Sequence, residues 1–436
     1  MSKVYIDTLG CAKNEYDSQV LSNLLENDGF ELVKEPELAD FLVVNTCGFI
    51  DDAKTESIER IFELADIKGN KKLVVTGCLS ERFHEELAKE MPEVDIFFGV
   101  NDYDKIPAIL SGKCDFNRDM VGKEYDSMPY RKRKLDNKPH YAYLKIAEGC
   151  NNACSFCAIP SIRGPYRSKR IEDCIREARD LADAGISELI LIAQDTSQYG
   201  KDLYGELKLP ELLTELCKID GIEWIRIMYV YDNSITDELI DTIAREPKIC
   251  KYVDMPIQHV ANNVLNRMRR QSSGKSIIET IKKLRNRIPD IHIRTTLLIG
   301  FPGETEEDFN ELLNFVDTMN IDRLGAFSYS DEEGTDSHDL DGKLDDETKQ
   351  IRRDTIMEHQ LLVSEKLNEK KIGQVLDVII DEKVEDGIYI GRSRYDAPDI
   401  DCEITISTKN ALKPGDIIKV KITNSYEYDL EGEEIQ

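Results

Sequence analysis

The sequence has little positive charge, and this shortage limits which partners the protein can bind. Lys and Arg total 57 against 85 Asp and Glu, so the 436 residues carry a formal net charge of −28 at pH 7. A surface of this sign repels the nucleic-acid backbone unless a local basic patch overrides it. We therefore expect basic partners, with solubility alone as the plainer explanation of the acidic excess.

Long hydrophobic runs are also missing. No uninterrupted apolar run approaches the ~20 residues that a membrane helix needs. The first residues, MSKVYIDTLGC, enter a strand-like pattern without the charged and apolar segments of a secretory leader. Internal repeats and low-complexity tracts are absent as well. With 41% hydrophobic residues the chain can still bury real cores, so the sequence predicts a cytoplasmic protein of about three domains.

The first domain, expected over residues 1–120, has the pattern of a parallel α/β unit. Short apolar runs predict strands at 4–9, 41–45, 73–76 and 94–98, and helical patterns lie between them at 17–28, 53–67 and 81–90. Alternation of strands and helices at this spacing indicates a mostly parallel sheet with helices on its faces.

Residues 121–139 are expected to be a linker, because they lack apolar periodicity and contain two prolines and the basic run 131–134. We interpret that run as a solvated loop rather than a nucleic-acid contact. A second basic cluster, Arg267, Arg269, Arg270 and Lys275, is interpreted as a solvated helix end. Contact with an anionic cofactor group or with the substrate is the alternative for this second cluster.

The second domain, expected over 140–371, repeats the α/β alternation. Strands are predicted at 141–147, 189–193, 225–229, 252–255, 293–299 and 324–328, with helices at 171–184 and 276–286 and a final helix at 346–370. Six strand–helix units of this kind suit a partial barrel of the TIM type.

The third domain, expected over 372–436, changes to short alternating strands. These are predicted at 374–380, 387–392, 404–406 and 417–425, with turn signals at 385–387 and 414–415. The pattern indicates a small antiparallel β-barrel.

Eleven cysteines are present in a chain without a secretion signal, which makes metal or cluster ligation a better hypothesis than a disulfide framework. Cys150, Cys154 and Cys157 are spaced C-x3-C-x2-C directly after the first strand of the second domain. Ligands of parallel α/β units bind outside the carboxyl ends of strands. Three thiolates there can hold three irons of a cubane cluster and leave the fourth iron open. A closed zinc site needs four ligands, and neither His nor a fourth Cys lies near this loop.

A second set consists of Cys11, Cys47 and Cys78, each of which follows a predicted strand of the first domain. If these strands are parallel, the three thiols lie at one edge of the sheet and can converge on one ion or cluster. Three separate buried cysteines remain the alternative. The remaining five cysteines do not follow predicted strands in this way; they are Cys114, Cys174, Cys217, Cys250 and Cys402. Cys174 is at an apolar position of a predicted helix, so we expect it to be buried in the hydrophobic core.

The C-x3-C-x2-C loop, with Phe156 before its last cysteine, resembles that of the radical S-adenosylmethionine enzymes. The resemblance implies a 4Fe–4S cluster whose unique iron binds S-adenosylmethionine, which is then cleaved to a 5′-deoxyadenosyl radical. It also implies that two sets of residues at strand ends meet the cofactor. One set is Gln194, Asp195 and Thr196, and the other is the turn in 295–305 that contains Gly300 and Gly303.

Together, TLGCAKN, VVNTCGFI, VVTGCLSER, YLKIAEGCNNACSFCAIPSIRG and IAQDT resemble the methylthiotransferases over nearly the whole chain. That family joins a three-cysteine domain, a radical barrel and a C-terminal barrel of the TRAM type. The resemblance implies a second 4Fe–4S cluster on Cys11, Cys47 and Cys78 that carries or delivers sulfur. It also implies that S-adenosylmethionine serves both as methyl donor and as radical source.

The charge of the third domain bears on the substrate. Residues 372–436 hold 15 acids and 7 Lys plus Arg, whereas a module that grips RNA phosphates should be basic. The stretch GRSRYDAPDID, 391–401, resembles the ribosomal-protein branch of the family, apart from Cys402, where glycine is expected. The resemblance implies modification of an aspartate β-carbon in small-subunit ribosomal protein number twelve, and an electron donor of the flavodoxin or ferredoxin type. We expect the C-terminal barrel to dock that protein.

Three alternatives stay open from the sequence: a transfer-RNA methylthiotransferase, a cluster carrier without enzymatic activity, and a zinc-bearing scaffold for basic proteins. The first shares every catalytic residue and differs only in its substrate. The second does not explain the barrel and its cofactor-facing loops. The third would contain zinc and neither iron nor sulfide.

Overall fold

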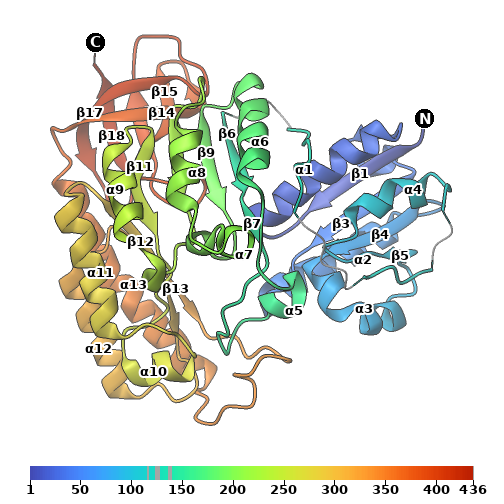
Figure 1. Ribbon diagram of the computed structural model, residues 1–436, viewed down its shortest axis with the longest axis horizontal. Coiled ribbons are helices and arrows are strands. Elements are labelled where there is room, and N and C mark those ends of the chain that lie inside the picture. Colours follow the sequence, from blue (N-terminus) through green and yellow to red (C-terminus); the bar gives the residue numbers. More distant parts are fainter. Residues whose placement is uncertain (115–116, 123–127, 136–139, 436) are drawn as a thin grey trace.

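The computed structural model describes residues 1–114, 117–122, 128–135 and 140–435. Two α/β units lie side by side, and a small β-barrel sits at one end of the larger unit (Figure 1). This arrangement matches the predicted fold class.

The N-terminal unit is a five-stranded parallel sheet in the order β2-β1-β3-β4-β5. Its strands are β1 (Lys3–Thr8), β2 (Glu31–Val33), β3 (Phe41–Thr46), β4 (Lys72–Gly77) and β5 (Ile96–Phe97), and its helices are α1 (Ala12–Asn27), α2 (Asp51–Asp66), α3 (Cys78–Glu90) and α4 (Ile106–Leu110), with 3-10 turns at Pro36–Leu38 and Tyr103–Lys105. Val43 and Val44 enter hydrophobic cores on opposite faces of the sheet. Strands buried on both faces read as continuous apolar runs, which explains why they were predictable. The short edge strand β2 was not predicted.

The central unit is a six-stranded, wholly parallel sheet in the order β13-β12-β11-β10-β9-β6. Its strands are β6 (Tyr141–Lys145), β9 (Glu188–Ile192), β10 (Trp224–Ile227), β11 (Ile249–Asp254), β12 (His292–Ile299) and β13 (Arg323–Ser328). The helices are α5 (Ile159–Arg163), α6 (Ile171–Asp183), α7 (Lys201–Tyr204), α8 (Leu209–Leu216), α9 (Asp237–Arg245), α10 (Asn262–Arg267), α11 (Gly274–Arg287), α12 (Glu306–Met319) and α13 (Asp346–Glu369), with 3-10 turns at Thr196–Gln198 and Asp232–Ser234. The short strands β7 (Ala147–Glu148) and β8 (Arg167–Ser168) pair beside β6.

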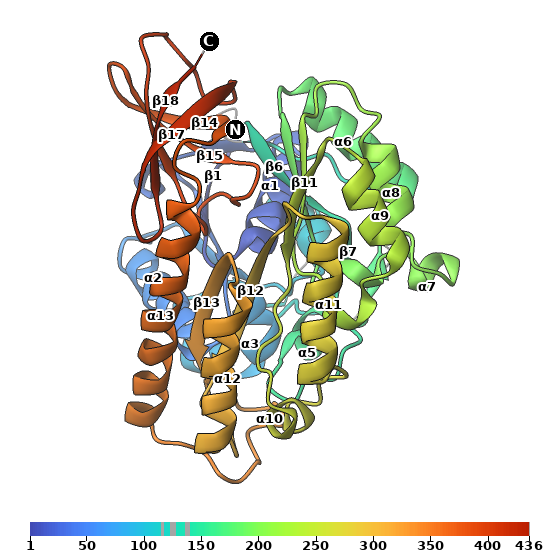
Figure 2. The ribbon, with the colours of Figure 1, turned by 90° about the vertical axis from the view of Figure 1, so that its left-hand side faces the viewer.

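Helices cover the outer face of this sheet, and the larger ones stand in a row in Figure 2. Leu189 and Leu191 of β9 pack against them, whereas Ile190 and Ile192 face the other side of the sheet. The sheet remains open between β13 and β6. The predicted partial barrel is therefore confirmed.

The C-terminal unit is a closed five-stranded barrel in the order β14-β15-β16-β18-β17. Its strands are β14 (Val375–Glu385), β15 (Ile388–Ser393), β16 (Ile404–Ser407), β17 (Ile417–Ser425) and β18 (Leu430–Glu434). β16 and β18 are parallel, so the barrel is not antiparallel throughout as the sequence suggested. β18 was missed because LEGEE has low strand propensity, although Leu430 and Gly432 are buried.

Residues 391–401 pack against the central unit. Within this stretch Arg392 lies 2.5 Å from Glu188, Asp396 lies 2.6 Å from Arg323, and Tyr252 donates to Asp401 at 2.7 Å. Glu188 and Arg323 begin β9 and β13. The stretch therefore closes the amino-terminal end of the six-stranded sheet, because its charged side chains pair with those of the strands.

The basic run 131–134 is only partly solvated, because Arg133 is buried whereas Lys132 is exposed. The Arg133 guanidinium lies 4.5 Å above the Tyr16 ring, and its Nε is 2.9 Å from Glu177 Oε1. Arg131 pairs with Asp104 and Lys134 with Glu26. The interpretation as a solvated loop is therefore wrong for Arg133, whose partners lie on α1 and α6, but it suits the exposed Lys132. The linker's residues 123–127 and 136–139 lie outside the described residues.

Candidate functional site

The loop with Cys150, Cys154 and Cys157 lies between β7 and α5, at the carboxyl end of the six-stranded sheet. Its start is set by Gly149, whose φ is +77° and where a Cβ atom would come within 2.2 Å of the Pro165 carbonyl oxygen. Its middle is fixed by Ser155, which donates through its amide to Met268 O at 3.1 Å and through its hydroxyl to Arg267 O at 2.8 Å. The backbone thereby holds the three sulfurs in place.

All three cysteines line one cavity of about 540 Å³. A second cavity, of about 650 Å³, shares Cys150 and also contains Asp195 and Tyr166. Soft thiolate donors of this kind suit iron–sulfur clusters. Over the described ranges, no three His, Cys, Asp or Glu side chains are grouped as one metal ion would need. A cubane cluster takes each thiolate on a different iron, so its ligands stand further apart.

Burial raises the pKa of Cys150 to about 11 and that of Cys157 to about 12. A metal that binds here must therefore displace protons from thiols that are neutral at pH 7. The hydroxyl of Tyr231 lies 2.8 Å from Cys154 Sγ. The Arg270 guanidinium lies 3.9 Å above the Tyr231 ring and donates to Pro256 O.

Arg270 is only 6% exposed, so the interpretation of its cluster as a solvated helix end is wrong for this residue. The same interpretation suits Arg269 and Lys275, whose side chains are 56% and 84% exposed. Arg267 donates to the carbonyl oxygens of Pro302 and Asp341. The sequence could not separate these roles, because the four cations look alike along the chain.

Of the predicted cofactor contacts at the end of β9, Asp195 lies closest to the cysteine loop. Its Oδ2 accepts from Asn152 Nδ2 at 2.9 Å, and burial raises its pKa. Gln194 donates to Glu148 Oε1 at 2.8 Å. Thr196 is buried, and its hydroxyl donates to Met228 O at 2.7 Å. The structure thus brings Gln194 and Asp195 to the loop, whereas the Thr196 hydroxyl is bonded to backbone.

Gly300 and Gly303 have positive φ values of 72° and 86°. A Cβ atom would lie 2.3 Å from Lys349 Cγ at the first and 2.6 Å from Arg267 Nε at the second. Neither glycine lines the two cavities beside Cys150. In this structure they allow close packing within the protein, and their contact with a cofactor stays a prediction.

Cys11, Cys47 and Cys78 follow the adjacent strands β1, β3 and β4, as expected. The loops after β1 and β3 touch, since a Cβ atom on Gly10 would lie 3.1 Å from Cys47 Sγ. Cys78 Sγ lies 3.7 Å from the Asn14 amide oxygen. Burial raises the pKa of Cys78 to about 12. The three thiols thus gather at one edge of the sheet.

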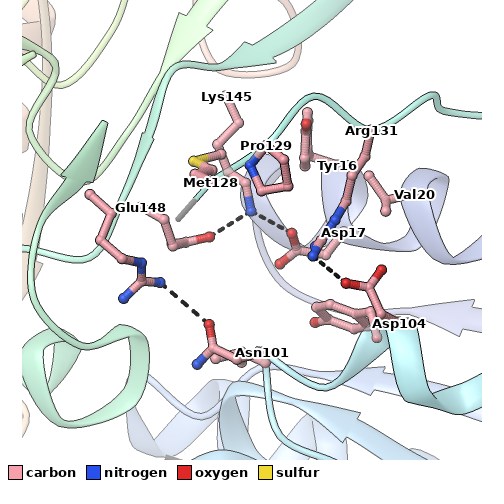
Figure 3. Close-up of a pocket in the computed structure, with 13 residues that line it drawn as sticks. Tyr16, Asp17, Val20, Asn101, Asp104, Met128, Pro129, Arg131, Lys145 and Glu148 are labelled. Atoms are coloured by element: carbon pink, nitrogen blue, oxygen red, sulfur yellow. Dashed lines mark hydrogen bonds and ion pairs between the residues drawn. The ribbon is translucent and has the colours of Figure 1, made fainter. Parts of the chain in front are cut away.

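A buried charged network joins this edge to the loop of Cys150, and the sequence analysis missed it. Lys145 lies 2.5 Å from both Asp17 and Glu148, and a small cavity of about 80 Å³ lies beside them (Figure 3). Arg163 lies 2.6 Å from Asp17 and donates to Cys78 Sγ at 3.2 Å. The signal in the sequence was Lys145, a charged residue in an otherwise apolar strand before the cysteine motif.

The remaining cysteines do not gather at either site. Cys174, Cys250 and Cys402 are buried, Cys217 is half-buried and Cys114 is exposed. Cys174 is a residue of α6 and packs in the hydrophobic core, as expected. Among the residues that the structure describes, no helix has the length and apolar character needed to span a bilayer.

Family models match all three units of the chain. The model described as uncharacterized protein family UPF0004 matches residues 3–99, that of the radical SAM superfamily matches 144–316, and that of the TRAM domain matches 372–435. Among solved structures, the radical S-adenosylmethionine methyltransferase TsrM from Kitasatospora setae is similar in fold, with a TM-score of 0.59 and 15% identity. The match covers 75% of this chain and 73% of that one.

Full-length relatives are much closer in sequence. The ribosomal protein uS12 methylthiotransferase RimO of Clostridioides difficile (strain 630) is 46% identical over 441 residues, which cover 99% of each chain. The protein of the same name from Thermoanaerobacter sp. (strain X514) is 46% identical over 438 residues, 99% of this chain and 100% of that one. The chain therefore belongs to the RimO family of radical S-adenosylmethionine methylthiotransferases.

Proposed function

We propose that this protein replaces a hydrogen on the β-carbon of an aspartate in ribosomal protein uS12 with a methylthio group. The observation that carries the proposal is 46% identity over the full length of a uS12 methylthiotransferase. The geometry supports the reaction type, because two separate cysteine triads lie at the carboxyl ends of two parallel sheets, and Arg163 contacts both Cys78 and the Glu148 carboxylate that precedes the Cys150 loop.

The proposed cofactors are two 4Fe–4S clusters and S-adenosylmethionine. Cys150, Cys154 and Cys157 would hold one cluster, and Cys11, Cys47 and Cys78 the other. When bound, these groups supply the radical that removes an unactivated hydrogen and the methylthio group that replaces it. Three sulfur donors in each set suit such clusters, and the cavities beside Cys150 leave room for a further ligand.

The protein's own residues position these groups. Asp195, held by Asn152 and Ser197, presents a buried carboxylate to the cavity beside Cys150. Gln194 would lie beside it, with Thr196 bracing the strand end and Gly300 and Gly303 supporting the neighbouring turn. Tyr231 orients Cys154, and Arg270 covers the Tyr231 ring and keeps water from it.

Charge supports a basic protein as the substrate. The chain carries a net charge of −28, and its C-terminal barrel is acidic as well, which favours association with a positively charged ribosomal protein over RNA. We place the reaction in the cytoplasm, where ribosomal proteins are made, with a flavodoxin- or ferredoxin-type electron donor. The proposed domains are 1–120, 140–371 and 372–436, joined by 121–139.

An anaerobic assay with reductant, sulfide and S-adenosylmethionine tests the proposal, with purified uS12 in one arm and transfer RNA in the other. We expect one uS12 aspartate peptide to gain a methylthio group by mass, and the RNA to stay unmodified. Cys150→Ala and Cys11→Ala should each abolish the product, whereas Cys174→Ala should not. Modified RNA with unmodified uS12 would overturn the substrate assignment.

A further inference from the structure

Arg163 is buried where the two cysteine sites meet. It ends α5, shortly after the loop of Cys157, and is 2% exposed. Its Nη1 lies 2.6 Å from Asp17 Oδ2 and 3.2 Å from Glu148 Oε2. Its Nη2 donates to Asn14 Oδ1 at 2.7 Å and to Cys78 Sγ at 3.2 Å. One guanidinium therefore contacts a cysteine of the N-terminal sheet and the glutamate that precedes the Cys150 loop.

The surrounding charges fix the direction of this guanidinium. Lys145 bridges Asp17 and Glu148, at 2.5 Å from each carboxylate (Figure 3). Two cations thus balance two carboxylates in a site that water hardly reaches. Because the guanidinium is planar and its donors are rigidly placed, contacts of Nη1 with the carboxylates hold Nη2 toward Cys78.

We propose that Arg163 is a positioning residue for the auxiliary cluster: with a cluster bound on Cys11, Cys47 and Cys78, it donates a charge-assisted hydrogen bond to the Cys78 thiolate and raises the cluster's reduction potential. The inference rests on the proposed function for the presence of that cluster. Hydrogen bonds to ligand sulfurs and local charge set such potentials, because they stabilise the more negative, reduced state. Burial strengthens the effect, since little water screens it.

This bond also depends on the contact between the two α/β units. Asp17 lies on α1 of the N-terminal unit, whereas Glu148 and Arg163 belong to the central one. The donor reaches Cys78 only when carboxylates from both units are in place. The potential of the cluster would then report on how the two units are packed.

The test uses the full chain with Cys150, Cys154 and Cys157 replaced by Ala, reconstituted anaerobically so that only the auxiliary cluster forms. The midpoint potential is measured by a redox titration followed by electron paramagnetic resonance. We expect Arg163→Gln to shift the midpoint to a more negative value. Lys145→Met is the matched control, because it removes a cation from the same network without touching a sulfur, and it should shift the midpoint less. An equal or larger shift in the control would overturn the inference.

Arg163→Gln leaves two buried carboxylates short of one cation, so this variant could fail to fold. A second measurement therefore uses the parent chain and a variant that keeps the charge. In the same full chain labelled with ¹⁵N-arginine, pulsed paramagnetic resonance of the reduced cluster should show a nitrogen coupling. The coupling should vanish in Arg163→Lys, which keeps the charge. An absent coupling in the parent chain would overturn the inference. Failure of that chain to bind iron and sulfide would contradict the proposed function as well, whereas a cluster with an unchanged midpoint in Arg163→Gln would contradict the inference alone.

Discussion

The guanidinium of Arg392 lies 2.5 Å from the carboxylate of Glu188, although 204 residues separate them in the chain. Both side chains are almost completely buried, and Glu188 also binds Arg226 at 2.9 Å. The first residue of β9 and the penultimate residue of β15 therefore share one buried ion cluster. The C-terminal barrel thus completes the central unit as well as forming a domain of its own.

Removal of Arg392 should destabilise the protein strongly. We expect Arg392→Met to lower the free energy of unfolding by about 3–5 kcal/mol, because it leaves a buried charge without one of its partners. Denaturant unfolding followed by circular dichroism measures the change. Arg353→Met, which removes an exposed pair with Asp354, is the control and should cost less than about 1 kcal/mol. Similar losses in the two variants would show that the Glu188 pair contributes little.

Stability should fall as the pH drops below about 6.5, because of His292. Burial lowers the pKa of His292 to about 4, and its ring stacks on Tyr395 at 3.9 Å. Between pH 4 and 6.5 His292 binds a proton more readily in the unfolded chain than in the folded one. The contribution of neutral His292 to the free energy of unfolding is therefore fully present above pH 6.5 and is lost as the pH falls to 4. At pH 5 the loss is about 2 kcal/mol.

The measurement is the free energy of unfolding at several pH values in parent and His292→Phe protein, since phenylalanine keeps a ring against Tyr395. We expect the variant to lose this part of the pH dependence. His338→Phe, at an exposed pair with Asp331, should keep it. An unchanged profile in His292→Phe would place the titrating group elsewhere.

Gly149 should be required for cluster binding at the Cys150 loop. Gly149→Ala forces a Cβ atom to within 2.2 Å of Pro165 O, so the loop must move and the three sulfurs with it. We expect the iron content to fall from about eight to about four per chain, because one of two cubanes is lost. Gly185→Ala is the matched control, with φ of +97° but nothing within 4 Å of the new atom. It should cost about 1 kcal/mol of stability and keep all the iron. Full iron content in Gly149→Ala would contradict the prediction.

Docking of uS12 is better tested by surface charge than by deletion of the third domain, because deletion would expose Glu188, Tyr252 and Arg323. Glu382, Glu385 and Glu433 are exposed on the C-terminal barrel. We expect their joint replacement by Lys to weaken uS12 binding at least several-fold at low salt, with a smaller effect at high salt. Equal affinity and an unchanged melting temperature would exclude these three positions as part of the docking surface.

Much of the fold could be predicted from local patterns. Most strands of the two α/β units are continuous apolar runs, so their positions along the chain could be predicted. The expectation of parallel pairing then placed Cys11, Cys47 and Cys78 at one edge of the sheet. The edge strand β2 and the closing strand β18 were missed, because short or acidic strands carry almost no hydrophobic signal. The burial of Arg133 in the basic run 131–134 was not predicted for a related reason, since its partners lie on elements distant in sequence.

The sequence by itself determined the chemistry, because cysteine spacing and strand-end placement depend only on local order along the chain. Tertiary structure alone decided which charges would be buried together. Arg163 meets Cys78, and Arg392 meets Glu188, only after two folded units have packed. Pairs of this kind leave no periodic pattern, and their free energy comes from excluding water from both partners at once.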